Sequence, residues 1–287
     1  MQPLTGVTVA DLTRYLPGPF ASRELLRLGA RVVKIEPPDG DPVRASAPGW
    51  YRNLNDGKEV LTWDGRNEPP PDVLLHADVV LEGFRPGVFE RLGIELPKHT
   101  ILCSITGFGV DGPRARQAGH DLNYLGYAGV LADTAPAVPP VQIADLAAGG
   151  QGAVIEVLAA LLERARTGSG ARLVVSMTHG SHRFVSHRVG AEEVPRLLTG
   201  GVACYRIYET ADGRHLTLAA LEPKFWRRLC ELLERPDLVE RAFERELPEL
   251  AELFRTRSLR DWLELLEHED TCVGPVSTRR EAAAELA

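Results

Sequence analysis

The first third of the chain alternates short apolar segments with amphipathic ones, and this alternation limits the possible folds more than any other feature. Residues 7–11 and 30–36 have the composition of buried strands, and residues 20–28 between them that of a helix. Two strands joined through a helix pair in parallel, because parallel strands need a crossover connection. Further strands are predicted at residues 59–62, 78–81 and 101–106. We therefore predict an α/β fold with a parallel sheet.

A strand, a helix and a strand ending on an acidic residue, here Glu36, resemble half of a dinucleotide-binding fold. The turn after the first strand, residues 12–19, reads Leu-Thr-Arg-Tyr-Leu-Pro-Gly-Pro and lacks the GxGxxG pattern. Without those glycines the backbone cannot closely approach a pyrophosphate. The sequence thus argues against a nicotinamide cofactor.

The composition changes near residues 199–201, which read Thr-Gly-Gly. Beyond this point, Asp212-Gly213 lies between two strand-like segments, which predicts a β-hairpin. We predict a large α/β domain over residues 1–198 and a smaller α+β domain over residues 199–270. Residues 271–287 are expected to return to the large domain.

Charge and composition exclude several classes of function. The net charge of −7 argues against a nucleic-acid surface. We find no apolar run of the roughly 20 residues that a membrane span needs, and no signal-peptide pattern at the N-terminus. The four cysteines are far apart and are predicted to be reduced. We expect a cytoplasmic protein that binds neither nucleic acid nor a membrane.

Two segments carry the side chains best suited to catalysis. His120 lies in a Gly-His-Asp sequence, and Asp145 follows it after a loop rich in proline and alanine. Asp145 directly precedes residues 146–164, whose apolar positions recur at helical spacing, so its carboxylate is predicted at or near the N-cap. An imidazole and a carboxylate can form a proton-transfer pair.

Three glycines, Gly149, Gly150 and Gly152, occupy the first turns of the predicted helix after Asp145. Each costs roughly 1 kcal/mol in a helix relative to alanine. Their presence indicates that something bulky packs against this helix. A thioester with its pantetheine arm and a closely packed second helix explain them equally well.

Three histidines, His179, His182 and His187, form the one cluster that suggests a metal site. Their spacing matches no zinc pattern, and no nearby cysteine or carboxylate completes a ligand set. We predict no metal site there.

Motifs along nearly the whole chain resemble one known family. They include Asp-Leu-Thr at 11–13, Pro-Gly-Pro-Phe at 17–20, Leu-Gly-Ala-Arg-Val-Val-Lys-Ile-Glu at 28–36, Phe-Arg-Pro-Gly-Val at 84–88 and Ser-Ile-Thr-Gly-Phe-Gly at 104–109. In these segments the chain is similar to the class III CoA-transferase superfamily, which includes carnitine and formyl-CoA transferases and α-methylacyl-CoA racemases. The resemblance implies a Rossmann-like large domain, a small domain and an interlocked homodimer with the active site between chains.

His120 and Glu222 resemble the racemase branch, in which the sequence is Gly-His-Asp and a Leu-Glu-Pro segment pairs its glutamate with the catalytic histidine. The resemblance implies a racemase of 2-methylacyl-CoA thioesters. His120, paired with Glu222, and Asp145 would transfer protons on opposite faces of the α-carbon through an enolate. Two alternatives remain: a CoA-transferase with Asp145 as nucleophile, and an inactive acyl-CoA-binding protein.

The CoA moiety is expected to belong to the substrate, so no separate cofactor is implied. Pro37, Asp56 and Glu59 depart from the family pattern and replace cations that relatives carry. The resemblance and the need for cations facing phosphates imply the following binding residues: Arg14, Asn55, Gly57, Lys58, Arg85, Arg91, Gly119, Asp121, Asn123 and Tyr124.

Overall fold

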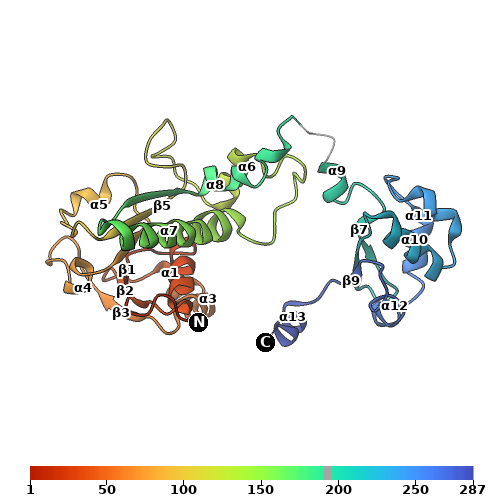
Figure 1. The fold of residues 1–287 in the computed structure, drawn as a ribbon, viewed down its shortest axis with the longest axis horizontal. Helices are drawn as coiled ribbons and strands as arrows, with labels where there is room; N and C mark the ends of the chain where they lie inside the picture. Colours follow the sequence, from red (N-terminus) through yellow and green to blue (C-terminus); the bar gives the residue numbers. More distant parts are fainter. Residues whose placement is uncertain (191–194, 287) are drawn as a thin grey trace. The chain divides into compact units, whose positions relative to one another are not determined.

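A six-stranded sheet with every neighbouring pair parallel lies at the centre of the first part of the chain (Figure 1). The computed structural model describes residues 1–190 and 195–286, which divide into two units, Met1–His187 and Arg188–Ala287. The strand order of the sheet is β3-β2-β1-β4-β5-β6. The strands are β1 (Thr8–Asp11), β2 (Arg31–Glu36), β3 (Glu59–Thr62), β4 (Val79–Glu82), β5 (Ile101–Thr106) and β6 (Arg172–Ser176).

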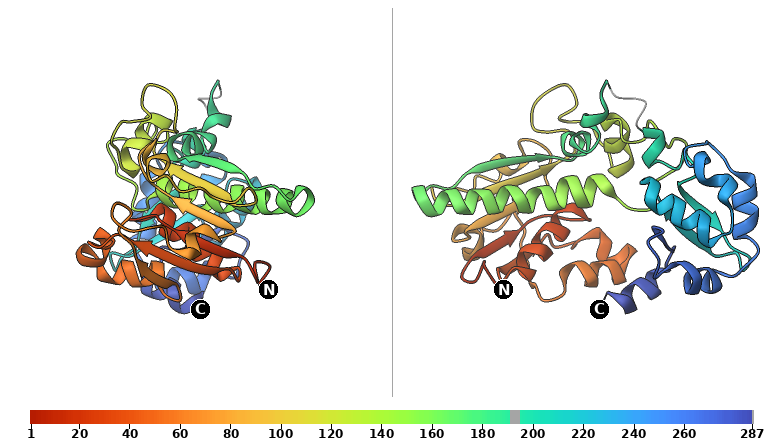
Figure 2. Two further views of the ribbon diagram at one scale, coloured as in Figure 1. Left: turned by 90° about the vertical axis from the view of Figure 1, so that its left-hand side faces the viewer. Right: turned by 45° about the vertical axis from the view of Figure 1, so that its right-hand side comes forward.

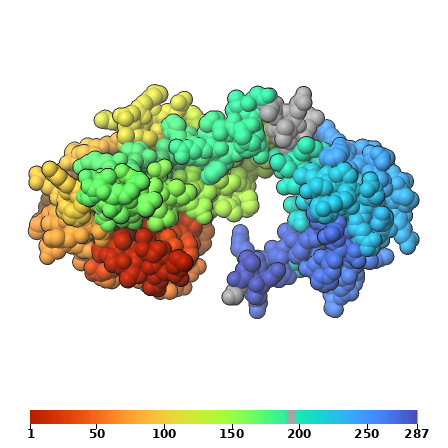
Figure 3. Space-filling view, viewed as in Figure 1, coloured from red at the N-terminus to blue at the C-terminus, as the bar shows by residue number. Residues whose placement is uncertain are grey.

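Helices cover both faces of this sheet. Successive strand residues point to opposite faces, so Val9 faces a core shared with α1 and α7, and Ala10 faces a second core shared with α4 and α5. Figure 2 shows α7 running alongside the strands, and α1 and α7 adjoin in Figure 3. The predicted α/β fold with a parallel sheet is confirmed. The helices of this unit are α1 (Pro17–Arg27), α2 (Pro42–Ser46), α3 (Pro48–Asn55), α4 (Asp72–Leu75), α5 (Val88–Arg91), α6 (Asp121–Ala128), the π-helix η1 (Ala144–Gln151), α7 (Gly152–Thr167) and α8 (Met177–Arg183).

The helix formed by η1 and α7 together, Ala144–Thr167, is the one helix of the described residues that is long and apolar enough to cross a membrane. A helix in the core of a water-soluble protein meets the same criteria. Ala153 and Val157 of this helix are fully buried against the sheet. Its length and composition are therefore weak evidence for a membrane span.

The second unit is built on an antiparallel sheet in the order β7-β8-β9. As Asp212-Gly213 predicted, β7 and β8 form a hairpin, and Gly213 has a φ of 70°, which glycine adopts readily. Trp226 and Trp262 are buried in its core. Its elements are the 3₁₀ turn η3 (Pro236–Arg241), the strands β7 (Tyr205–Glu209), β8 (His215–Ala219) and β9 (Val273–Pro275), and the helices α9 (Pro195–Leu198), α10 (Pro223–Leu232), α11 (Pro248–Phe254), α12 (Leu259–Leu266) and α13 (Arg279–Glu285). The 3₁₀ turn η2 (Ser186–Arg188) spans the boundary between the two units.

The domain boundaries differ from those predicted. We expected the large domain to end at residue 198 and residues 271–287 to return to it, whereas the first unit ends at His187. The C-terminal segment belongs to the second unit because β9 pairs with β8, and Glu281 of α13 forms an ion pair with Arg214 at 2.9 Å. A short strand that completes a sheet carries too few apolar residues to be assigned to a domain from sequence.

Candidate active site

Asp145 is the second residue of η1, and Ile143 occupies the N-cap position. It thus lies in the first turn of the helix, two residues after the N-cap and near the predicted position. Its backbone N–H donates to the carboxylate of Asp121 at 3.0 Å, which joins the Asp145 helix to the His120 segment. The helix begins with wide π-type turns, which occur frequently at functional sites.

The glycines that follow Asp145 are explained by packing against other parts of the chain. A side chain at Gly149 would come within 2.9 Å of Met177, and one at Gly150 within 2.6 Å of Phe20 and 3.1 Å of the carbonyl of Pro17. Of the two explanations left open by the sequence, the packed helix is the one observed. The N-terminal turn of α1 occupies the space that side chains would need.

His120 lies at the N-cap position of α6 and is held there by its neighbours. Its backbone N–H donates to the side-chain oxygen of Asn123 at 3.1 Å. The hydroxyl of the buried Tyr124 donates to the carbonyl of Gly119, where a side chain would come within 2.8 Å of the Tyr124 ring. We predicted Asn123 and Tyr124 as CoA-binding residues, and the structure gives both a role in shaping the histidine loop.

His120 and Asp145 line one cavity of about 740 Å³ in the first unit. His120 is exposed, whereas Asp145 is half-buried. Of the residues predicted to bind CoA, Arg14, Arg85, Gly119, Asn123 and Tyr124 also line this cavity. The remaining wall includes the apolar residues Pro17, Phe84, Pro86, Val88, Ile105, Phe108 and Met177. The cavity therefore presents two groups that can transfer protons and two cations against an apolar surface.

Burial, and after it the nearby Asp121 carboxylate, raises the pKa of Asp145 to about 7. At neutral pH this carboxyl is therefore present in both protonation states, which suits a group that both accepts and donates a proton.

The guanidinium groups of Arg14 and Arg85 form no ion pair with any described residue, so both cations remain available to an anionic ligand. Arg14 also lines a neighbouring cavity of about 630 Å³, together with Pro37 and Trp63. Arg14 follows β1 and so lies at the carboxyl ends of the parallel strands, where nucleotide sites in such sheets are typically found. Sequence reasoning missed Trp63, although its place directly after β3 was the available signal.

Lys58 and Asn55, which we predicted to bind CoA, line neither of these two cavities. The Lys58 ammonium is buried and donates to the side chains of Asn55 at 2.8 Å and Ser22 at 2.7 Å. It also lies 3.5 Å from the carboxylate of Asp11. Burial lowers the pKa of Lys58 to about 8, against the opposing effect of Asp11. Both side chains are thus occupied inside the protein.

Three predicted residues lie elsewhere. Gly57, with a φ of 79°, forms the turn before β3, and Arg91 is on α5 beside Gly87 rather than on the cavity wall. Glu222 belongs to the second unit, where it is the N-cap residue of α10. Its pairing with His120 stays a prediction.

The histidine cluster forms contacts of its own. His179 contacts the hydroxyl of Ser176 at 2.8 Å, and His182 contacts the carbonyl of Ala128 at 3.1 Å. Over residues 1–190 and 195–286, no three histidine, cysteine or acidic side chains group as a metal site would require.

A family model described as CoA-transferase family III matches residues 4–286. The chain is 33% identical to an α-methylacyl-CoA racemase from Homo sapiens, over 97% of this chain and 78% of that protein. It is 28% identical to a succinyl-CoA:glutarate CoA-transferase from Homo sapiens, over 99% of this chain and 74% of that protein. The crystal structure of Rv3272 from M. tuberculosis aligns with a TM-score of 0.83 and 29% identity, over 99% of this chain and 85% of that one.

Proposed function

Because the chain belongs to CoA-transferase family III, we propose that it racemises 2-methylacyl-CoA thioesters. One observation carries this proposal: His120 and Asp145 line the same cavity. Burial also raises the pKa of Asp145 to about 7, which suits a group that both accepts and donates a proton. Inverting a carbon beside a thioester requires an acid or base on each face of that carbon. The similarity to an α-methylacyl-CoA racemase supports the same reaction.

In the proposed reaction, a neutral His120 removes the α-proton of one enantiomer, and the electron pair moves to the thioester oxygen to give an enolate. Protonated Asp145 then donates a proton to the opposite face of the carbon. For the other enantiomer, ionised Asp145 is the base and protonated His120 the acid. Each turnover inverts the carbon, and no oxidant or reductant is needed.

The enolate oxygen needs hydrogen-bond donors. The first backbone N–H groups of the Asp145 helix are not free for this role, because that of Asp145 donates to Asp121 and that of Leu146 donates to the carbonyl of Gln142. Among the described residues no acceptor is found for the N–H groups of Asp121 and Leu122, in the first turn of α6. We propose that this turn, adjacent to His120, holds the enolate oxygen.

For the CoA portion, we propose that Arg14 and Arg85 face the phosphates. The cavity of about 630 Å³ that Arg14 shares would hold the adenine against Trp63 and Pro37. This assignment replaces the predicted contribution of Lys58, whose ammonium is occupied by Asn55 and Ser22.

CoA transfer is the second candidate, and the similarity to a succinyl-CoA:glutarate CoA-transferase favours it. In that reaction ionised Asp145 attacks the thioester carbonyl and expels the CoA thiolate, which leaves an acyl anhydride on the enzyme. The CoA thiolate then attacks the Asp145 carbonyl of the anhydride, which releases the first acid as a carboxylate and leaves CoA as a thioester on Asp145. A second carboxylate attacks this thioester and expels the thiolate, and the thiolate attacks the acyl carbonyl of the new anhydride, which gives the product thioester and frees the Asp145 carboxylate. His120 has no required role in these steps.

An isotope experiment separates the candidates. The protein is incubated in D₂O with a single enantiomer of a 2-methylacyl-CoA, and α-deuterium and CoA transfer are followed by mass spectrometry. A racemase incorporates deuterium and loses optical purity without a second acid. Product that forms only when a free carboxylic acid is supplied, with no α-deuterium, would instead establish transfer.

We predict that Asp121→Asn shifts the pH dependence of α-exchange. The substitution removes the negative charge of Asp121, which helps to raise the pKa of Asp145. It keeps a side-chain oxygen that can accept the hydrogen bond from the backbone N–H of Asp145. The pKa should fall below about 7 yet stay above 3.8, since burial is the larger cause. For the enantiomer on which Asp145 is the base, kcat/KM rises with pH through this pKa, so the midpoint should move to lower pH.

The matched control is Asp111→Asn, which removes the same charge from an exposed loop residue outside the cavity wall. Its pH profile should overlay that of the wild-type protein. An unchanged midpoint in Asp121→Asn would mean that Asp121 does not influence the titration of Asp145.

A further inference from the structure

Tyr15, in the loop between β1 and α1, has an unusual backbone conformation. Its φ is 69°, in the left-handed region that side-chain-bearing residues rarely adopt and that favours glycine or asparagine. Tyr15 has no role in the proposed proton transfer. Such a conformation persists only when the surrounding structure imposes it, and it is concentrated at functional sites.

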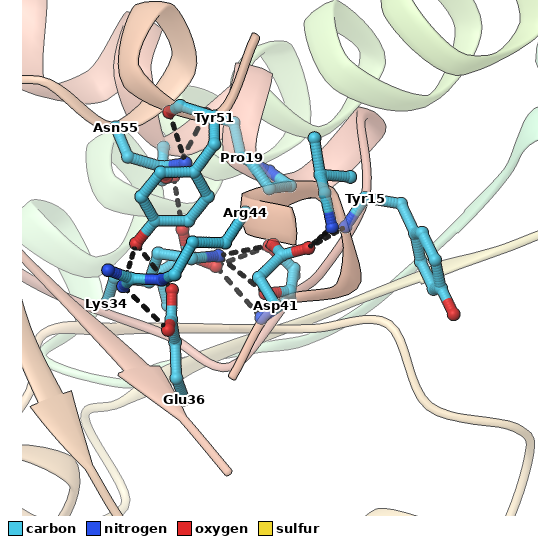
Figure 4. A network of polar contacts seen from close by, with 12 residues as sticks. Tyr15, Pro19, Lys34, Glu36, Asp41, Arg44, Tyr51 and Asn55 are labelled. Atoms are coloured by element: carbon cyan, nitrogen blue, oxygen red, sulfur yellow. Dashed lines mark hydrogen bonds and ion pairs between the residues drawn. The ribbon is translucent and has the colours of Figure 1, made fainter. Parts of the chain in front are cut away.

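Buried charged groups form hydrogen bonds with the backbone of Thr13 and of Tyr15 itself, and these bonds hold the loop in place. Lys34, which is fully buried, donates its ammonium to the carbonyl of Thr13 at 2.9 Å and pairs with the buried Asp41 at 3.2 Å. Asp41 in turn accepts from the backbone N–H of Tyr15 at 3.4 Å (Figure 4). Asp11 accepts from the N–H of Thr13 at 2.9 Å.

The far end of the loop is held as firmly. Lys58 donates to the carbonyl of Pro19 at 2.9 Å. The chain folds back so tightly that a side chain at Gly18 would come within 2.1 Å of the Thr13 hydroxyl. The loop can therefore relieve the conformation of Tyr15 only by breaking contacts of buried ions, which are costly to leave unpaired.

These contacts at both ends of the loop hold the ring of Tyr15 in place. In Figure 4 the ring points away from the buried network, and it is 51% exposed. It lines the cavity that also contains His120 and Asp145. A large, half-exposed aromatic side chain in such a position adds a rigid apolar face to the cavity wall.

We propose that Tyr15 determines specificity by packing against the acyl chain of the bound thioester. This inference rests on the proposed function in taking an acyl-CoA as the ligand. A flat ring with an apolar face stabilises an aliphatic chain in proportion to the area that it covers. Short acyl groups, which do not reach the ring, gain nothing from it.

Calorimetric titration of the full chain with CoA, acetyl-CoA and decanoyl-CoA tests the proposal without any need for turnover. Tyr15→Gly removes the ring at a backbone conformation that glycine accepts, and Tyr15→Asn does the same with a second residue type that tolerates it. Either should weaken decanoyl-CoA binding about tenfold, as expected for one lost aromatic–aliphatic contact. Binding of CoA and acetyl-CoA should change by less than about twofold. Tyr15→Phe keeps the ring and should bind all three ligands like the wild-type protein.

An equal loss for all three ligands would place Tyr15 beside the CoA portion and overturn the inference, and so would an unchanged affinity for decanoyl-CoA. It would also be overturned if the wild-type protein bound decanoyl-CoA no more tightly than CoA. Failure of the proposed racemase activity is a separate result, because it appears as absent α-deuterium incorporation by the wild-type protein. If the wild-type protein incorporated no α-deuterium but Tyr15→Gly lost the preference for decanoyl-CoA over acetyl-CoA, the inference about Tyr15 would still hold.

Discussion

The Asp145→Asn variant is expected to lose α-proton exchange by a factor of about a thousand or more, the upper range for removing a general acid–base group. The amide has the size of the carboxyl but neither removes nor supplies the proton, so both directions of racemisation fail. CoA transfer would fail as well, because the amide does not form an acyl anhydride. Deuterium incorporation into each enantiomer of a 2-methylacyl-CoA, followed by mass spectrometry, measures the loss.

The fold of Asp145→Asn should be at least as stable as that of the wild-type protein at alkaline pH. A carboxyl whose folded-state pKa is raised from 3.8 to about 7 makes folding less favourable as the pH rises through that interval. The neutral amide removes this effect, so the urea midpoint at pH 8 should be equal to or higher than that of the wild-type protein. Retained exchange in a folded variant would exclude Asp145 from the chemistry.

Much of the first unit could be predicted from the sequence because its signals are local. Parallel strands buried on both faces are nearly continuously apolar, and the consecutive residues Val9 and Ala10 illustrate this by entering two different cores. The π-type start of the Asp145 helix could not be predicted. Nor could the close approach of Phe20 and Pro17 to Gly150, since these residues lie far away in the sequence.

In the candidate site, too, residues with a distinctive local pattern could be predicted, and those whose setting depends on distant residues could not. His120 and Asp145 were found because their local patterns are distinctive, and they do line one cavity. Lys58 was predicted to bind CoA from the family resemblance and the need for cations facing phosphates, whereas tertiary folding buries it beside Asp11. Burial of a charge depends on a distant partner of opposite sign, and the pattern around either residue contains no sign of the other.

The His120→Asn variant separates the two candidate reactions. In the racemase, His120 is the proton-transfer group on one face, so exchange should fall about a thousandfold, within the range for removing such a group. Transfer through an Asp145 anhydride needs no imidazole and should continue. The expected result is therefore a loss of α-deuterium incorporation, measured by mass spectrometry, with substrate binding retained.

The control for His120→Asn is His76→Asn, because His76 does not line the cavity that contains His120. His76 directly follows α4, and the buried Leu74 of α4 packs on the face of the sheet opposite α1 and α7. The backbone N–H of His120, which donates to Asn123, remains in the variant, so the loop should keep its conformation. If His120→Asn exchanged the α-proton at the wild-type rate while Asp145→Asn did not, a single base would serve both faces. A carboxylate fixed in the first turn of η1 cannot reach both sides of one carbon, so that outcome would contradict racemisation by this pair.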